Sequence, residues 1–219
     1  MKKGITKILS ACVFAFVVFL AAGTQSKAAV NMGVKQTGAG SSYVDLAWNA
    51  QLGAGHYHTQ FSQDGKNWID MEYSSSPSDS VYNLTQGASY YARVVAYNGS
   101  HYSGTHVMVG VSETAIVSTK PTEVTGLTQT AAGVNSVSMS WNASAGAASY
   151  VIYGYINYNW TQIGTSATNS ATITGVAATT STKFSVAAVK NVTGGTVTGD
   201  QCSGVEMKAI PIKVSRIAM

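Results

Sequence analysis

Apolar and polar residues alternate with a period of two along much of the chain, which predicts short β-strands. In residues 44–50, Val44, Leu46 and Trp48 point to one side and the residues between them to the other. This is the pattern of a strand with one buried face. Turn signals separate such segments, for example the Asp-Gly dipeptide within residues 63–66, where Gly tolerates a positive φ. After residue 29 no stretch keeps the period of an α-helix, so the pattern predicts an all-β protein.

The strand pattern occurs twice, about 93 residues apart. Residues 44–50 align with residues 137–143, and Tyr57 meets Tyr150 at the same offset. At an offset of 92, Trp68 matches Trp160 and residues 92–96 match residues 184–188. Four matches in the same order indicate a duplicated unit of about 90–100 residues, a size typical of a β-sandwich.

These repeated residues carry a resemblance to a pair of fibronectin type III modules, as found in secreted bacterial proteins. Residues 121–127 are similar to the family's first strand, Trp48 and Trp141 to its core tryptophan, and Tyr57 and Tyr150 to a tyrosine of a following strand. The resemblance implies two tandem immunoglobulin-like sandwiches whose cores contain these four aromatic side chains. We expect the first module at residues 30–118 and the second at residues 119–215, joined by a very short linker.

Residues 84–90 of the first module resemble the family's tyrosine corner. Leu84 and Tyr90 match the motif, which implies that the Tyr90 hydroxyl bonds to upstream backbone. The second module has Val176 and Thr182 at these positions, so we expect its corner to be less firmly held.

The first 29 residues predict a removable export signal. Lys2, Lys3 and Lys7 form a basic start, residues 13–22 are apolar, and Ser26 and Ala28 fit the small-residue cleavage pattern. The apolar run is shorter than the 18 or so residues expected of a membrane span. We therefore expect cleavage after residue 28 or 29, no membrane insertion of the mature chain, and a location outside the cell, either free or held non-covalently at the cell surface.

Removing the signal changes the charge and cysteine content. The full chain has 13 basic and 9 acidic residues, but four of the lysines precede residue 30, which leaves no net charge. A neutral chain gives no electrostatic reason to expect nucleic acid as a partner. Cys202 is then the only cysteine, so the sandwiches are stabilised by core packing, and we expect this thiol to be buried.

Catalytic motifs are missing from the sequence. It contains no nucleophile elbow, zinc-protease helix, phosphate-binding glycine loop or cysteine pair. Asp70 and Glu72 have the spacing that places two carboxylates on one strand face, but nothing marks a cleft around them. We predict no catalytic residues, no cofactor and no enzymatic activity.

Four histidines raise the question of a metal site. His56 and His58 have strand spacing, and the resemblance implies that their end of the strand lies near the loop with His101 and His106. Imidazoles are zinc ligands. Spacing of two is also that of the polar side of an alternating strand, and on this interpretation we predict no metal ligands.

Exposed aromatic residues are the remaining binding candidates. If Tyr150 and Ile152 point inward, Tyr153 and Tyr155 point outward with only small residues opposite, Ser185 and Ala187. The full set of candidate ligand-binding residues is Tyr153, Tyr155, Tyr158, Trp160, Tyr91 and Tyr97. Aromatic residues are also favoured in strands simply because they pack against cross-strand neighbours.

Two functional hypotheses follow. The first is a secreted, monomeric, non-catalytic binding or adhesion protein that contacts extracellular or cell-wall protein or polysaccharide. The second is a structural spacer without a ligand of its own.

Overall fold

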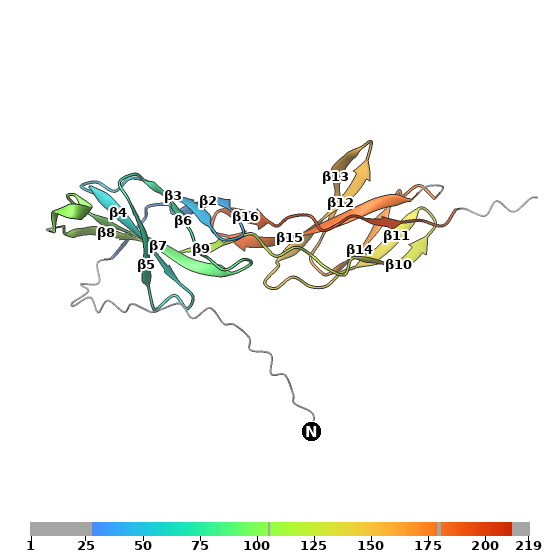
Figure 1. Ribbon diagram of the computed structural model, residues 1–219, viewed down its shortest axis with the longest axis horizontal. Coiled ribbons are helices and arrows are strands. Elements are labelled where there is room, and N and C mark those ends of the chain that lie inside the picture. Colours follow the sequence, from blue (N-terminus) through green and yellow to red (C-terminus); the bar gives the residue numbers. More distant parts are fainter. Residues whose placement is uncertain (1–27, 105, 179–180, 212–219) are drawn as a thin grey trace, which may run out of the picture.

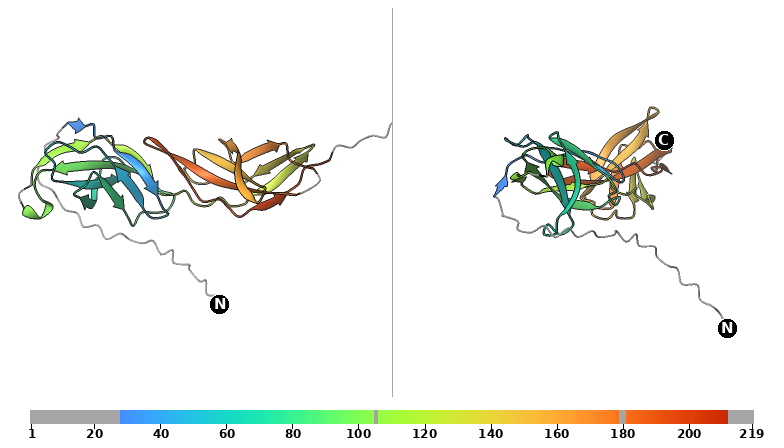
Figure 2. Two further views of the ribbon diagram at one scale, coloured as in Figure 1. Left: turned by 90° about the horizontal axis from the view of Figure 1, so that it is seen from above. Right: turned by 60° about the vertical axis from the view of Figure 1, so that its left-hand side comes forward.

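Figure 1 shows the chain as two β-sandwiches arranged end to end along the longest axis, and Figure 2 shows the same arrangement from above. The structure is a computed structural model that describes residues 28–104, 106–178 and 181–211. The first sandwich contains β1 (Ala29–Val30), β2 (Lys35–Ala39), β3 (Val44–Ala47), β4 (His56–Ser62), β5 (Ile69–Ser74), β6 (Ser78–Val81), β7 (Ser89–Tyr97), a 3-10 helix (His101–Ser103), β8 (Met108–Ser112) and β9 (Ala115–Ser118). The second contains β10 (Thr128–Gly133), β11 (Ser136–Ser140), β12 (Ser149–Ile156), β13 (Asn159–Ser166), β14 (Ser170–Thr174), β15 (Thr182–Val192), β16 (Gly195–Thr198) and β17 (Val205–Met207).

Each sandwich packs a three-stranded sheet against a larger one. In the first, the small sheet has the order β2-β3-β6 and the large one β1-β8-β7-β4-β5, with β9 also paired to β7. In the second, the orders are β10-β11-β14 and β13-β12-β15-β16, with β17 paired to β15. The strand pairs are antiparallel except for β1 and β8. The predicted all-β pair of sandwiches is confirmed.

The two cores are built around equivalent aromatic pairs. The rings of Trp48 and Tyr57 meet edge to face with centroids 5.4 Å apart, and those of Trp141 and Tyr150 meet the same way at 5.2 Å. Each tyrosine hydroxyl accepts a hydrogen bond from the backbone N–H six residues before it, at 3.1 and 3.0 Å. Edge-to-face aromatic pairs add stability beyond burial alone. The repeat seen in the sequence therefore reflects the same packing in both sandwiches.

The six residues expected in the cores are all buried there, namely Trp48, Tyr57, Leu84, Tyr90, Trp141 and Tyr150. In the first sandwich the Tyr90 hydroxyl accepts a hydrogen bond from the backbone N–H of Thr85 at 3.0 Å, as a tyrosine corner requires. Val176 is buried in the second sandwich, and Thr182 begins β15.

The segment between β1 and β2 is joined to the end of β8 by hydrogen bonds to a carboxylate. Glu113, just after β8, accepts hydrogen bonds from the backbone N–H groups of Met32 and Val34, each at 2.9 Å. Burial alone raises the pKa of Glu113, but these bonds outweigh it, and its pKa lies below its usual value. Ala29 lies within β1, so cleavage after residue 28 leaves this strand whole, whereas cleavage after residue 29 shortens it.

Residues 1–27, most of the predicted export signal, lie outside the described part of the chain. Within the part that is described, no helix has the length and apolar character needed to cross a membrane.

Side chains and backbone bridge the two sandwiches at their junction. Thr193, in the β15–β16 turn, donates its backbone N–H to the Ile116 carbonyl at 2.8 Å and accepts the Ile116 N–H on its hydroxyl at 2.7 Å. Lys190 on β15 donates to the Gly87 carbonyl, and Lys120 pairs with Asp200 at 2.7 Å. The second sandwich is thereby tied to the first at several points.

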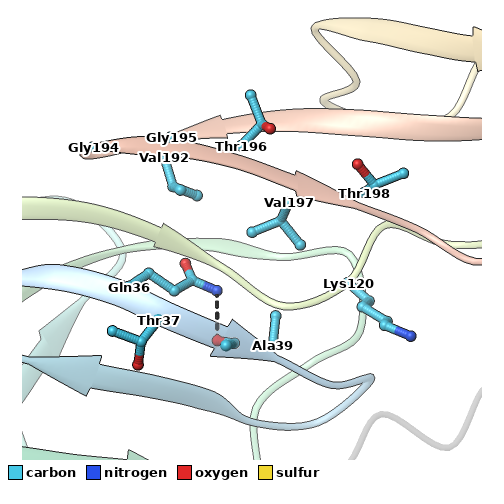
Figure 3. Close-up of a pocket in the computed structure, with 11 residues that line it drawn as sticks. Gln36, Thr37, Ala39, Lys120, Val192, Gly194, Gly195, Thr196, Val197 and Thr198 are labelled. Carbon is cyan, nitrogen blue, oxygen red and sulfur yellow. Dashed lines mark hydrogen bonds between the residues drawn. The ribbon is translucent and has the colours of Figure 1, made fainter.

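A shallow hollow of about 370 Å³ lies at this junction (Figure 3). Its walls are β2 of the first sandwich and the β15–β16 hairpin of the second, with Val192 and Val197 on one side and Gln36 and Ala39 on the other. The Gln36 side-chain amide donates to the Gly38 carbonyl at 3.0 Å and to the Ser118 carbonyl at 2.7 Å, and its oxygen accepts the Ser118 N–H. Gln36 is therefore occupied in joining β2 to β9.

Candidate functional site

The β12–β13 hairpin carries most of the aromatic residues selected from the sequence. Ile156 pairs with Asn159, which leaves Asn157 and Tyr158 as a two-residue turn. Both turn residues have positive φ, 50° and 65°, as a type I′ turn requires. Asn suits its position, but the second position favours glycine, and a bulky tyrosine there is strained. The hairpin projects sideways from the second sandwich (Figure 1).

The strained turn places Tyr158 in solvent, where its side chain is 90% exposed. Directly behind it, Tyr155 and Trp160 pair across the two strands with ring centroids 5.3 Å apart and are 41% and 39% exposed. The Trp160 ring also packs so closely on Gly204 that a Cβ there would lie 2.8 Å from it. Trp160 therefore packs on both Tyr155 and Gly204, whereas the Tyr158 side chain is almost fully exposed. We call Tyr155, Tyr158 and Trp160 the aromatic tip.

Tyr153 differs from the sequence expectation of an outward, exposed ring. Tyr153 is partly buried rather than exposed, and Ser185 and Ala187 on the neighbouring β15 are fully buried. A register shift between Ile152 and Tyr153 interrupts the pairing of β12 with β13 at this point. The face near Tyr153 is therefore covered, and the exposed aromatic surface begins at Tyr155.

Tyr91 and Tyr97 lie in the other sandwich, on β7, and do not join the aromatic tip. Tyr91 is partly exposed beside Gly65 of the β4–β5 turn. Tyr97 is half-buried, and its ring stacks on His56 with centroids 5.3 Å apart and planes 14° from parallel. Burial raises the pKa of Tyr97 above its usual value, with nearby Asp70 adding to the rise.

The end of the first sandwich beside Tyr97 brings the histidines together. His56 and His58 begin β4, and His101 begins the 3-10 helix in the β7–β8 loop. One ring nitrogen from each of the three lies within 4.8 Å of the others. His106 adds a fourth ring, with its centroid 5.2 Å from that of His56. We call His56, His58 and His101 the histidine cluster.

His56 lies on the face of β4 opposite the core residue Tyr57, as the alternation predicts, but this face is not open to solvent at His56. Although it lies outside the hydrophobic core of the sandwich, His56 is only 2% exposed. The loop between β7 and β8 is the physical reason: its Gly99 carbonyl lies 3.1 Å from His56 Nδ1, and His101 packs edge-on against the His56 ring. The period of two could not show this covering, because it depends on a loop more than 40 residues further along the chain.

His58 lies partly buried between the cluster and a carboxylate. Its Nε2 is 3.2 Å from His101 Nδ1, and its Nδ1 is 4.0 Å from an oxygen of Asp70. Burial lowers the pKa of His58, and the other histidines lower it further, against the opposing effect of Asp70. The neutral imidazole, which is the form that binds metals, is therefore favoured.

Two tyrosines that the sequence analysis did not select complete the surroundings of the cluster. The Tyr73 ring stacks on His101 with centroids 4.1 Å apart and planes 7° from parallel, and its hydroxyl bonds to that of Tyr102. Together with His56 and His101 they line a hollow of about 360 Å³. Tyr73 lies on β5, far in sequence from the β7–β8 loop. Its contact with His101 in that loop depends on how the strands pair, which the sequence pattern does not show.

The remaining candidates have ordinary surroundings. Asp70 and Glu72 are both exposed on β5, and Asp70 accepts a hydrogen bond from the Gln60 amide at 2.7 Å. Cys202 is buried, as expected, and its sulfur accepts a hydrogen bond from the Val186 N–H at 3.2 Å.

Comparison with known proteins gives one curated relative and several solved structures. No protein-family model matches the chain. Chitinase A1 of Niallia circulans is 33% identical over 162 residues, which cover 70% of this chain and 22% of that protein. The chain thus spans about a fifth of the length of this relative.

Solved structures of tandem modules are similar at low sequence identity. A two-domain fibronectin type III segment of chicken tenascin is 17% identical, with a TM-score of 0.41 and coverage of 80% of this chain and 97% of that one. The FN1–FN3 domains of chicken CNTN1 are 15% identical, with a TM-score of 0.46 and coverage of 83% and 68%.

The strand order itself decides the fold. In both sandwiches a three-stranded sheet faces a larger one, and a buried tryptophan and tyrosine lie at equivalent positions in the core, as the sequence resemblance implies. The first sandwich also has the tyrosine corner at Tyr90. The chain is built of two tandem β-sandwiches of the fibronectin type III type.

Proposed function

We propose that the chain is a non-catalytic extracellular binding protein that holds polysaccharide through the aromatic tip of the β12–β13 hairpin. The observation that carries the proposal is Tyr158, an aromatic side chain presented to solvent at a backbone position that favours glycine. Strain of this kind is retained where the side chain has a use.

The geometry of the tip suits a flat, partly polar ligand. Tyr155 and Trp160 form a pair behind the exposed Tyr158 ring, and aromatic rings combine large apolar area with a polar group at one edge. Such residues contribute most of the binding energy where they anchor an interface. Sugar rings present an apolar face with hydroxyl groups around it, so they match this surface.

The predicted export signal and the similarity to Chitinase A1 of Niallia circulans support an extracellular, polysaccharide-related role. That relative is named for an enzyme of chitin breakdown, and this chain spans only about a fifth of it. Its activity is accordingly not assigned to this chain. Chitin is the first polysaccharide to use as a probe.

A structural spacer is the second candidate, and the junction supports it. Thr193 and Ile116 exchange two hydrogen bonds between the sandwiches, and Lys190 adds a third. A junction held at several points favours a fixed separation of the two ends, which is what a spacer supplies.

Co-sedimentation with insoluble chitin tests the proposal. We expect the chain to be retained and Tyr158→Gly to be released, because glycine removes the ring while fitting the turn. Tyr82→Ala is the matched control, since it removes an exposed tyrosine of the first sandwich. Retention of Tyr158→Gly to the same extent as the unchanged chain contradicts the role of the tip. A folded chain that no polysaccharide retains, with chitin, cellulose and peptidoglycan all tested, favours the spacer.

A further inference from the structure

His56 has a buried ring nitrogen without a partner. Its Nδ1 lies 3.1 Å from the Gly99 carbonyl and must carry a proton to bond to it. Its Nε2 then has a free lone pair, and this atom has no hydrogen-bond partner among the described residues. A buried polar atom left unpaired costs free energy, so such atoms call for an explanation.

We propose that His56, His58 and His101 bind a zinc ion. One ring nitrogen of each residue lies within 4.8 Å of the other two. His58 Nε2 and His101 Nδ1 are 3.2 Å apart, close to the separation of about 3.3 Å between two nitrogens bound tetrahedrally to one zinc ion. The ion supplies the missing partner of His56 Nε2.

The groups around the cluster orient the rings as a metal site requires. Metal-binding histidines usually bond through their second ring nitrogen to a carbonyl or carboxylate. His56 Nδ1 faces the Gly99 carbonyl, and His58 Nδ1 faces Asp70 at 4.0 Å. Both residues therefore present Nε2 to the ion. His101 presents Nδ1, and its ring is held by stacking on Tyr73.

The donor set selects the kind of ion. Three imidazoles suit zinc and related transition metals, whereas calcium and magnesium prefer oxygen ligands. Three protein ligands leave one tetrahedral position for water. His56 and His101 line the adjoining hollow of about 360 Å³, from which a water molecule would reach that position.

The alternative is that the three histidines only form hydrogen bonds with one another, and this accounts for part of their arrangement. A hydrogen bond between His58 and His101 accounts for their separation of 3.2 Å. It leaves His56 Nε2 unpaired at a residue that is 2% exposed. The proposal does not depend on the aromatic tip, because all four histidines belong to the first sandwich.

Calorimetric titration of zinc into the full chain tests the proposal, using protein produced without a polyhistidine tag and freed of metal with a chelator. We expect one saturable site and a rise in the thermal midpoint as zinc is added, since a ligand that binds only the folded state stabilises it. We expect His58→Gln and His101→Gln each to weaken zinc binding by more than about tenfold. Both residues are less buried than His56, so these changes preserve the core.

His106→Gln is the matched control, because it changes a histidine of the same loop that is not among the three ligands. Its zinc affinity should stay within about twofold of the unchanged chain, a difference of about 0.4 kcal/mol or less. The proposal is overturned by the absence of saturable binding or by normal binding in His101→Gln. It is equally overturned if His106→Gln loses binding as fully as His101→Gln.

Discussion

The Nε2 atom of His58 lies 3.2 Å from the Nδ1 atom of His101, although 43 residues separate the two in sequence. The contact joins the start of β4 to the 3-10 helix of the β7–β8 loop. A metal ion bound to both histidines would therefore also hold the β7–β8 loop against the sheet.

The first prediction concerns the stability of that loop. Zinc should slow chymotrypsin cleavage at Tyr102, an exposed residue next to His101, because cleavage requires the loop to leave the sheet. Digestion followed by mass spectrometry measures the rate at this bond. The protection should disappear in His101→Gln, and equal cleavage with and without zinc in the unchanged chain contradicts the prediction.

The second prediction separates strain from binding at Tyr158. Tyr158→Gly should leave the thermal midpoint unchanged or raise it, since relief of about 1 kcal/mol of left-handed strain offsets the greater freedom of glycine when unfolded. Tyr158→Ala keeps the strained backbone and should be less stable than Tyr158→Gly. Thermal unfolding of both variants measures the difference. A glycine variant less stable than the alanine variant argues against strain at this turn.

The third prediction concerns pH and Glu113. Its pKa is lower in the folded chain than in the unfolded one, so its stabilising effect is complete above the unfolded pKa and is lost as the pH falls through the folded pKa. Glu113→Gln should therefore lower the free energy of unfolding by about 1 kcal/mol at pH 7, a modest value because solvent screens a partly exposed carboxylate. Urea unfolding at several pH values measures it. The two proteins should converge in acid, and a difference that is independent of pH would mean that the charge of Glu113 has no part in the effect.

The fourth prediction tests the expected division into modules at residues 30–118 and 119–215. Trp141→Ala should destabilise the second sandwich by about 3–5 kcal/mol, as expected for a large aromatic residue removed from a core. Calorimetry should show one unfolding transition moved to lower temperature and the other, around Trp48, in its original place. A single transition that moves as a whole would show that the two sandwiches unfold together.

The fifth prediction concerns the junction. Lys190 is 4% exposed and donates to the Gly87 carbonyl of the other sandwich, and burial lowers its pKa. Lys190→Met keeps much of the side-chain volume but removes this bond, so the angle between the sandwiches should vary more. Small-angle X-ray scattering measures the range of shapes. Identical scattering from the variant and the unchanged chain would show that Thr193 and Ile116 hold the junction without Lys190.

Much of the fold was predictable because burial on one face of a strand repeats every second residue. The alternation at Val44, Leu46 and Trp48 identified a strand, and its return near Trp141 identified the duplication. The periodic pattern did not predict a further equivalence between the two modules. Gly33 and Gly126, 93 residues apart, both have positive φ, and each packs against the asparagine that follows its core tryptophan. A single glycine gives no periodic signal, so only the structure shows that it belongs to the repeat.

The candidate sites were less predictable, because they depend on loops. The sequence identified Tyr155, Tyr158 and Trp160, which are near one another along the chain and share one hairpin. It could not show that Tyr97 packs on His56, since that contact depends on strand register and on the path of the β7–β8 loop. Contacts between neighbours in sequence follow from periodicity, whereas contacts between a strand and a distant loop do not.

The sideways direction of the β12–β13 hairpin determines how the molecule meets a surface. The hairpin projects away from the long axis rather than along it (Figure 1). A polysaccharide bound by Tyr158, as proposed, would therefore meet the side of the second sandwich rather than the junction between the two sandwiches. The first sandwich, with its histidine cluster, would then stay clear of the bound polymer.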